Sequence, residues 1–280
     1  MMQQSQIGHA RRDAFLARIG ARPLIMGILN VTPDSFSDGG RFLAPDAALA
    51  HARQMVDDGC DIIDIGAEST RPGATPVAIE EELSRIEPAL ALLTERLDVP
   101  LSVDTTKPAI ASRAAALGAA VINDVWGLQQ DPAMADVVAA AGTAIVITHN
   151  RQSTDKSIDI IEDIRRFFER SLAIAQRAGI PYRHVILDPG IGFAKSSRQN
   201  RDVIARLGEL KHYDLPILVG ASRKRFLGKL TGDGIEGTLI GTLTVSLMAI
   251  AAGADMVRVH DIAEHAAALK VLHALRSRDE

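Results

Sequence analysis

The chain has 280 residues and a formal net charge of −4. This length allows two domains, but no linker rich in glycine, serine and proline divides the chain, and single barrel domains of this size are common. The negative charge argues against nonspecific nucleic-acid binding, and the richest apolar stretch, residues 242–254, is long enough for a buried helix but too short to span a membrane. The single cysteine, Cys60, excludes an internal disulfide, is expected to be a buried thiol, and fits a cytoplasmic location.

Residues 1–22 differ in character from the rest of the chain. They are rich in arginine and lack the apolar core of a signal sequence, so we interpret them as an N-terminal extension with a short amphipathic helix; a targeting peptide is the alternative. In residues 23–280, short apolar runs alternate with helical periodicity. Apolar residues recur every three or four positions in the segments 46–58, 79–97, 108–117, 131–141, 161–172, 200–212, 237–252 and 261–276.

Eight short apolar runs of strand type each lead into polar residues. The first ends at Asn30, the third at Asp104 and the sixth at Asp188, and the last leads into Arg258 and His260. Strict alternation of strands and helices predicts parallel pairing with right-handed crossovers. We therefore expect an α/β fold consisting of a single (β/α)8 TIM barrel, with an open doubly wound sheet as the runner-up. In either fold the active site lies where the carboxyl ends of the strands meet.

Two connections are much longer than a strand-to-helix turn requires. One runs from Asn30 to Pro45 and the other from Gly66 to Val77, and both are rich in glycine, proline, serine and threonine. Composition alone favours disordered surface loops. Because both connections follow the first two strands on the predicted active-site rim, we interpret them as mobile flaps over the site.

Seven motifs, in this order along the chain, carry a family resemblance. They are NVTPDSFSDGG (30–40), IGAESTRPGA (65–74), SVDT (102–105), VINDVWG (121–127), DPGIGFAK (188–195), GASRKRFLG (220–228) and RVHD (258–261). From about residue 23 onward, the chain resembles the dihydropteroate synthase family of folate biosynthesis. The resemblance implies a (β/α)8 barrel that joins 4-aminobenzoate to 6-hydroxymethyl-7,8-dihydropterin pyrophosphate and releases pyrophosphate. It also implies a magnesium ion (Mg2+) and a homodimer.

Three strand ends are predicted to bind the pterin. One edge of a pterin carries a ring N–H beside an amino group, and the ionised carboxylate of Asp188 can accept hydrogen bonds from both. Asn123 can donate and accept at the neighbouring ring atoms, and Asp104 can accept from the dihydropyrazine side. Each residue taken alone is better explained as a cap of the following helix, but their convergence favours a pocket, and the resemblance assigns all three to the pterin. Asp124 points the other way on its strand and is interpreted as structural.

The motif GASRKRFLG supplies further binding candidates. The resemblance implies that Lys224 binds the carbonyl and ring nitrogen of the pterin. It also places the carboxylate of 4-aminobenzoate near Ser222, at a helix start where free amides favour anions, although serine is also a common cap. Phe193 either packs against the benzoate ring or belongs to the core. The chain departs from the family pattern at Thr148, where many members carry methionine, and at Arg225, where some carry serine.

The leaving pyrophosphate requires cations at the rim. Arg258 and His260 project from the same side of the last strand and fit that role. The resemblance makes Asn30 a magnesium contact, since magnesium takes few protein oxygens beside those of substrate phosphates. Asp38, in the first flap, is a candidate for activating or steadying the reacting groups. The family's aminobenzoate-facing segment corresponds to the second-flap residues Thr70, Arg71 and Pro72.

No covalent nucleophile is evident, and the lone pair of an aromatic amine needs no strong base. We therefore expect a dissociative substitution at the pterin methylene, in which pyrophosphate leaves first and the protein acts by position and charge. His149 is either a catalytic base or, at least equally well, a histidine that supports the site through hydrogen bonds. Two other functions stay open: methyl transfer from methyltetrahydrofolate to a corrinoid protein, and pterin binding without turnover. The catalytic candidates are Asp38, Lys224, Arg258 and His260.

Overall fold

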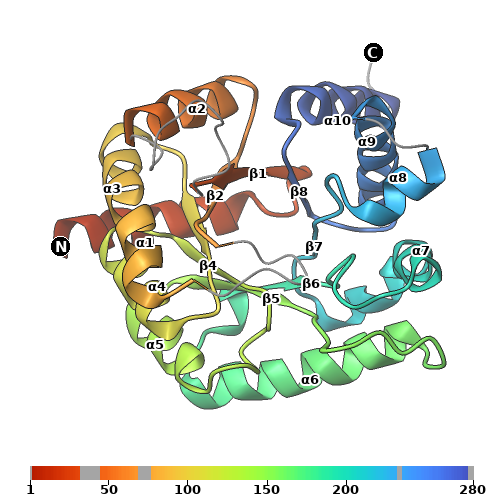
Figure 1. The fold of residues 1–280 in the computed structure, drawn as a ribbon, viewed down its shortest axis with the longest axis horizontal. Coiled ribbons are helices and arrows are strands. Elements are labelled where there is room, and N and C mark those ends of the chain that lie inside the picture. Colours follow the sequence, from red (N-terminus) through yellow and green to blue (C-terminus); the bar gives the residue numbers. More distant parts are fainter. Residues whose placement is uncertain (1, 32–44, 69–76, 232–234, 277–280) are drawn as a thin grey trace.

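A computed structural model describes residues 2–31, 45–68, 77–231 and 235–276. Its strands are β1 (Leu24–Asn30), β2 (Ile62–Gly66), β3 (Leu101–Asp104), β4 (Val121–Asp124), β5 (Ala144–Thr148), β6 (Val185–Asp188), β7 (Leu218–Val219) and β8 (Met256–Val259). All pairs are parallel, in the order β6-β5-β4-β3-β2-β1-β8-β7. A further parallel bridge, between Leu187 and Ile217, connects the two ends of this order and closes the barrel (Figure 1). The predicted (β/α)8 barrel is confirmed, and the open sheet is excluded.

The helices follow the predicted periodicity with two differences. The barrel helices are α2 (Pro45–Asp57), α3 (Ile79–Arg96), α4 (Pro108–Ala116), α5 (Ala133–Ala141), α6 (Ile160–Ala178), α7 (Ser197–Ala205), α8 (Arg225–Thr231), α9 (Ile235–Ala251) and α10 (Ile262–Arg276). The single helix expected over 200–212 is α7 followed by 3₁₀ turns over Leu207–Tyr213, and the short α8 was not predicted. No described helix is both long and apolar enough to cross a membrane.

Side chains along each strand alternate between two apolar layers. The inner layer fills the barrel with residues that include Leu24, Met26, Ile62, Val121, Val146, Ile186, Leu218 and Met256. The outer layer packs beneath the helices and includes Ile25, Leu29, Ile63, Val103, Ile145 and Val257. Both faces of the sheet are therefore buried, which is why the strands read as continuous apolar runs in the sequence.

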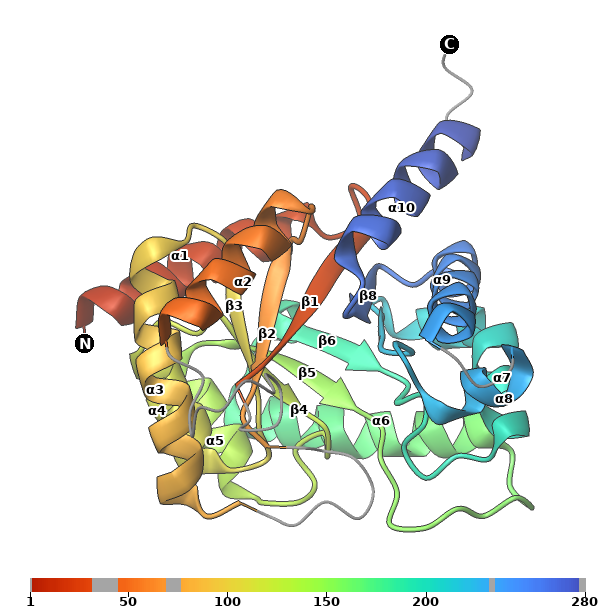
Figure 2. The ribbon, with the colours of Figure 1, turned by 45° about the horizontal axis from the view of Figure 1, so that its top comes forward.

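The helix α1 (Met2–Arg18) lies at the amino-terminal ends of the strands (Figure 2). It has 17 residues, so it is longer than the short helix expected for the extension. Phe15 is 1% exposed and packs into the inner barrel layer. Arg18 and Arg22 both pair with Asp61, just before β2. The extension therefore closes the end of the barrel opposite to the predicted site.

Candidate active site

The register of the sheet brings the predicted polar strand ends together. Asn30 pairs with Gly66, Gly66 with Asp104, and Asp104 with Asn123. Asp188 ends β6, two strands beyond Asn123. We call Asp104, Asn123 and Asp188 the rim acceptors; all three are at most 6% exposed, whereas Asn30 is exposed. Parallel strands thus place these side chains on one rim, as expected.

An ion cluster that the sequence did not reveal connects two of the rim acceptors. The Arg258 guanidinium donates from Nε to Asp64 Oδ2 at 2.6 Å and from Nη2 to Asp104 Oδ2 at 3.0 Å. Asn123 donates from Nδ2 to the same Asp64 oxygen at 2.9 Å. Asp64 is completely buried in the middle of β2. A charged residue inside an otherwise apolar strand was the signal that could have identified it.

The cluster holds two buried carboxylates against one cation. Burial raises the pKa of Asp104 to about 7; the Arg258 charge opposes this rise, and the Asp64 charge adds to it. Within the described residues, several of the buried polar atoms here have no hydrogen-bond partner: Asp64 Oδ1, Ser102 Oγ, Asp104 Oδ1 and Asn123 Oδ1. Buried polar atoms are nearly always paired. Of these atoms, Asp104 Oδ1 and Asn123 Oδ1 stand at the rim and are suited to accept from the N–H groups of a ligand.

The rim acceptors are not helix caps. The helices that follow them begin at the N-cap residues Lys107, Pro132 and Ser196, and only Ser196 uses its own side chain as a cap. The alternative explanation of the rim acceptors is therefore wrong. Asp124 behaves differently, because it accepts from two backbone amides in the turn after β4. Its structural interpretation is confirmed.

Asp188 is held in place by the segment that follows it. Its Oδ1 accepts from the Gly190 amide at 2.7 Å. Burial raises the pKa of Asp188, while the Gly190 hydrogen bond and the charges of Lys224 and Lys195 lower it. The opposing effects leave Asp188 as a carboxyl group whose ionisation depends on nearby cations.

Lys224 and Phe193 lie together beside Asp188. The Lys224 ammonium lies 4.2 Å from the centre of the Phe193 ring and donates to the Ile191 carbonyl. Gly192 has φ +83°, and a Cβ there would lie 2.7 Å from Lys224 Cδ, so a side chain at this position would strain the backbone and displace the lysine. Phe193 is partly exposed and is therefore not simply part of the core.

Ser222 and His260 form a pair at the ends of β7 and β8. The Ser222 hydroxyl accepts from the His260 amide at 3.2 Å and lies 2.9 Å from His260 Nδ1, to which it can donate. This pair fixes the orientation of the imidazole. Ser222 precedes the helix start, since α8 begins at Arg225, which is exposed.

Four predicted site residues lie outside the described part of the chain: Asp38, Thr70, Arg71 and Pro72. The described residues on either side of the second long connection are joined to each other. Glu68 Oε1 accepts from the Val77 amide at 3.0 Å, and Lys107 donates to the Val77 carbonyl at 2.9 Å and pairs with Glu68. Both ends of this connection are thus attached near the rim that carries Asp104.

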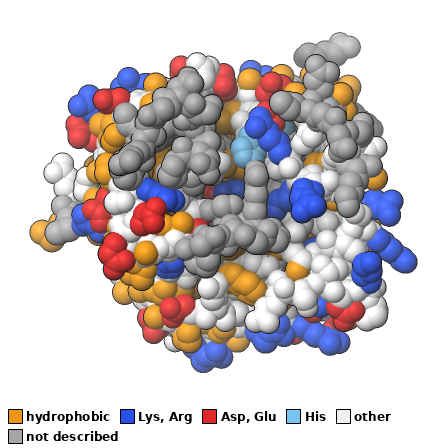
Figure 3. Space-filling model, in the orientation of Figure 1, with side chains coloured by type: hydrophobic (Ala, Val, Ile, Leu, Met, Phe, Trp, Pro, Cys, Tyr) orange, Lys and Arg blue, Asp and Glu red, His pale blue; other side chains and the backbone are white. Residues whose placement is uncertain are grey.

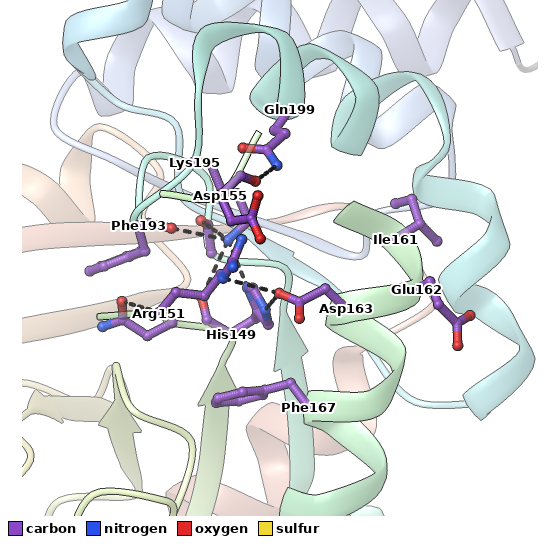
Figure 4. Close-up of polar contacts among 12 residues, drawn as sticks. His149, Arg151, Asp155, Ile161, Glu162, Asp163, Phe167, Phe193, Lys195 and Gln199 are labelled. Carbon is purple, nitrogen blue, oxygen red and sulfur yellow. Dashed lines mark hydrogen bonds and ion pairs between the residues drawn. The ribbon is translucent and has the colours of Figure 1, made fainter. Parts of the chain in front are cut away.

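His149 supports the structure and is not placed to act as a base. The residue is 1% exposed, and both ring nitrogens have partners: Nδ1 lies 2.7 Å from Lys195 Nζ and Nε2 lies 3.2 Å from Asp163 Oδ2 (Figure 4). Burial, reinforced by the Lys195 charge, lowers the pKa of His149 to about 3. A neutral ring engaged on both sides leaves no nitrogen for substrate, which resolves the alternative in favour of a supporting role.

The view along the shortest axis shows how charge is distributed around the site. Lysine and arginine side chains, together with a histidine, gather around the middle of this face (Figure 3). The acidic side chains visible in this view lie mostly toward the periphery. A surface of positive charge attracts anionic ligands such as phosphates.

Comparison with known proteins identifies the family. A family model described as pterin binding enzyme matches residues 26–260. The chain belongs to this family. It is 43% identical over 277 residues to the dihydropteroate synthase of Bacillus subtilis, covering 99% of this chain and 96% of the relative. A crystal structure of the Clostridium difficile dihydropteroate synthase, determined in the presence of pteroic acid, aligns with a TM-score of 0.89 at 45% identity and covers 93% of this chain and 99% of that one.

A second solved structure that resembles this chain contains a different ligand. The Xanthomonas albilineans dihydropteroate synthase with 4-aminobenzoic acid aligns with a TM-score of 0.88 at 42% identity, covering 92% of this chain and 94% of that one. The likeness therefore extends over almost the whole chain, and the matched range of the family model, 26–260, includes all three rim acceptors.

Proposed function

We propose that the chain is a dihydropteroate synthase, a transferase of folate biosynthesis. It joins 4-aminobenzoate to 6-hydroxymethyl-7,8-dihydropterin pyrophosphate and releases pyrophosphate, giving 7,8-dihydropteroate. The observation that carries this proposal is a pair of buried acceptor atoms on the rim, Asp104 Oδ1 and Asn123 Oδ1, which have no hydrogen-bond partner among the described residues. They lie in a barrel that matches dihydropteroate synthases over nearly its full length. A corrinoid methyltransferase and a noncatalytic pterin-binding protein have no comparable support.

The rim acceptors bind the pterin edge. Ionised Asp188 accepts from the ring N–H and the amino group, while Asn123 and Asp104 serve the neighbouring ring atoms. Lys224 donates to the pterin carbonyl and ring nitrogen. The Asp64 contact supports this assignment, because it holds the Asn123 amide with Nδ2 turned to Asp64 and leaves Oδ1 as the acceptor for the ligand.

The reaction is a substitution at the pterin methylene carbon. The bond from this carbon to the pyrophosphate oxygen breaks, the electron-rich pterin stabilises the cation, and the amine nitrogen of 4-aminobenzoate then forms the new bond and loses a proton. Arg258 and His260 stabilise the negative charge of the departing pyrophosphate. Ser222 supports this role by fixing the His260 ring, and the basic surface around the site favours the same anion. Phe193 packs on the benzoate ring in this proposal, which its position against Lys224 supports.

Magnesium fits this site only if the substrate supplies most of the ligands. Within the described residues, no group of three or more histidine, cysteine or acidic side chains could hold a metal ion. Asn30 offers one exposed amide oxygen at the rim. Because magnesium binds phosphate oxygens and water readily, we propose that Asn30 contacts an ion held mainly by pyrophosphate, where the ion would neutralise phosphate charge.

We also propose that the protein is a cytoplasmic homodimer. Large exposed apolar side chains gather on the last three helices: Leu230, Ile240, Met248, Val271 and Leu275. An apolar surface shared by consecutive helices is typical of an interface between subunits. The cytoplasmic location is supported by the free, buried Cys60.

Turnover tests the proposed function directly. Purified protein is mixed with the pterin pyrophosphate, 4-aminobenzoate and magnesium, and 7,8-dihydropteroate is measured by chromatography. We expect product that depends on all three additions. Pterin binding without product would indicate the noncatalytic alternative, and the proposal would be wrong.

Asp188→Asn provides the first site prediction. The amide would present a donor where the pterin edge also donates, so we expect kcat/KM to fall about 10- to 100-fold or more. Asp136→Asn, on the exposed face of α5, is the matched control and should leave kcat/KM unchanged. Near wild-type turnover of Asp188→Asn would mean that the pterin lies elsewhere.

A further inference from the structure

Lys195 is a buried cation that the proposed chemistry does not use. It is 8% exposed, belongs to the segment that joins β6 to α7, and directs its ammonium toward His149 at the end of β5 (Figure 4). Its Nζ is 2.7 Å from the Gly190 carbonyl and 2.7 Å from His149 Nδ1, with the Phe193 carbonyl at 3.4 Å. A lysine ammonium only donates, so Nδ1 of the neutral imidazole accepts and its Nε2 donates to Asp163.

These contacts connect Lys195 to the proposed pterin acceptor through hydrogen bonds and the backbone of Gly190. Asp163 accepts from His149, His149 accepts from Lys195, and Lys195 donates to the Gly190 carbonyl. The amide of the same glycine donates to Asp188 Oδ1. Gly190 therefore contacts both groups: its carbonyl binds the buried ammonium, and its amide binds the Asp188 carboxylate.

The backbone is built to allow this contact. Gly190 has φ +67°, in the left-handed region, and a Cβ there would lie only 1.9 Å from the His149 carbonyl oxygen. A side chain at this position would push the segment away from β5 and break the approach of Lys195. Lys224 holds the next residue, since it donates to the Ile191 carbonyl. Two lysines thus fix the backbone on which Asp188 and Phe193 stand.

Burial of an ammonium without a carboxylate partner requires a compensating interaction. Within the described residues, Lys195 forms no ion pair with a carboxylate; its direct partners are carbonyls and the imidazole. Its charge does act on Asp188, where it opposes the effect of burial and lowers the pKa of that carboxyl. Burial lowers the pKa of Lys195 well below its ordinary value, and the negative charge of Asp188 opposes this effect. The other charged groups acting on Asp188 or Lys195 are Lys224, Arg258, Arg151 and Asp163.

We propose that Lys195 is a positioning residue of the pterin site: held by His149, it acts through Gly190 to keep Asp188 in the geometry and the charge state that accept the pterin edge. The inference rests on the proposed function, because it concerns the acceptor of the same substrate. It assigns no contact between Lys195 and the substrate. It also explains why a buried lysine is joined to a neutral histidine.

Lys195→Met tests the proposal, because methionine keeps an unbranched side chain of similar length and removes the charge. We expect the Kd for 6-hydroxymethylpterin, measured by calorimetry at neutral pH, to rise about tenfold, the effect of losing one charge-assisted interaction. Loss of the cation also raises the pKa of Asp188, so the affinity should fall at a higher pH on acidification than in the wild type. Lys156→Met, at an exposed position, is the matched control.

The pH profile separates positioning from a purely structural role. A lower unfolding midpoint with an unchanged pH profile, or a pterin Kd within twofold of the wild type, would overturn the proposal. If Lys195→Met does not fold, Asp163→Asn tests the proposal instead. This variant keeps the lysine but weakens the hydrogen bond that orients His149, so it should weaken pterin binding severalfold. Unchanged pterin binding in Asp163→Asn would equally overturn it. Absence of pterin binding by the wild-type protein would instead refute the proposed function.

Discussion

Arg258 carries one positive charge between the buried carboxylates of Asp64 and Asp104. Removing it leaves both carboxylates without this cation, which is more damaging than losing a surface charge because Asp64 is completely buried and Asp104 is only 6% exposed. The same guanidinium serves the pyrophosphate in the proposed reaction. Its loss should therefore affect stability, pterin binding and turnover together.

We predict that Arg258→Ala lowers the free energy of unfolding by about 3–5 kcal/mol, the cost of breaking a buried ion pair. The turnover number should fall about 10²-fold or more, since one preorganised donor to the leaving group is lost. Urea unfolding and the product assay measure the two effects. Arg177→Ala, exposed on α6, is the control and should change neither. An Arg258→Ala protein as stable as the control would mean that the cluster contributes nothing to folding.

The protonation of Asp104 gives a prediction about pH. Its pKa rises in the folded protein from the ordinary value of 3.8 to about 7, chiefly through burial. A raised pKa means that the native state holds the proton more tightly, so this contribution to stability is full below pH 3.8 and is lost as the pH rises through about 7. Relative to Asp104→Asn, the wild-type free energy of unfolding should therefore fall between these limits, with a slope of at most about 1.4 kcal/mol per pH unit. Parallel curves for the two proteins, measured by urea unfolding, would contradict the assignment.

At the scale of elements, the sequence predicted the barrel because its strands are buried on both faces and its helices on one. Apolar runs located the strands, and the polar residues after them located the rim. The helix expected over 200–212 failed for a physical reason: Leu207 and Leu210 are both buried, and a spacing of three suits 3₁₀ turns as well as an α-helix. Asp64 and Lys195 were missed because their partners, Arg258 and His149, are distant in the chain.

The packing of α1 could not be predicted for the same reason, because its buried side chains contact strands that are distant in the chain. Phe15 packs into the inner layer of the barrel. No pattern in the neighbouring sequence predicts that contact. We predict that Phe15→Ala lowers the free energy of unfolding by about 3–5 kcal/mol, the cost of deleting a buried aromatic ring. Met2→Ala is the control on the same helix, at a residue that is 86% exposed. Equal stability of the two variants would mean that the extension is not part of the folded barrel.

At the scale of the whole molecule, the two ends of the barrel have different roles. The amino-terminal end is closed by α1, and the carboxyl-terminal end carries the rim acceptors and the cations. The apolar surface of α8, α9 and α10 lies on the side of the barrel, and α10 extends beyond the barrel in Figure 2. Because this surface is formed by helices and not by the strand ends, a second subunit can cover it without closing the site.

We predict that a charge on this surface disrupts the proposed homodimer. Ile240 and Met248 are 61% and 53% exposed, and they lie two turns apart on α9. Substitution of either by glutamate would bury an unpaired charge in the interface, so Ile240→Glu and Met248→Glu should each shift the protein from dimer to monomer in sedimentation experiments. Val56→Glu places the same charge at an exposed apolar position on α2 and should leave the dimer intact. The interface would have to lie elsewhere if both α9 variants remained dimeric at the concentrations at which the wild type is a dimer.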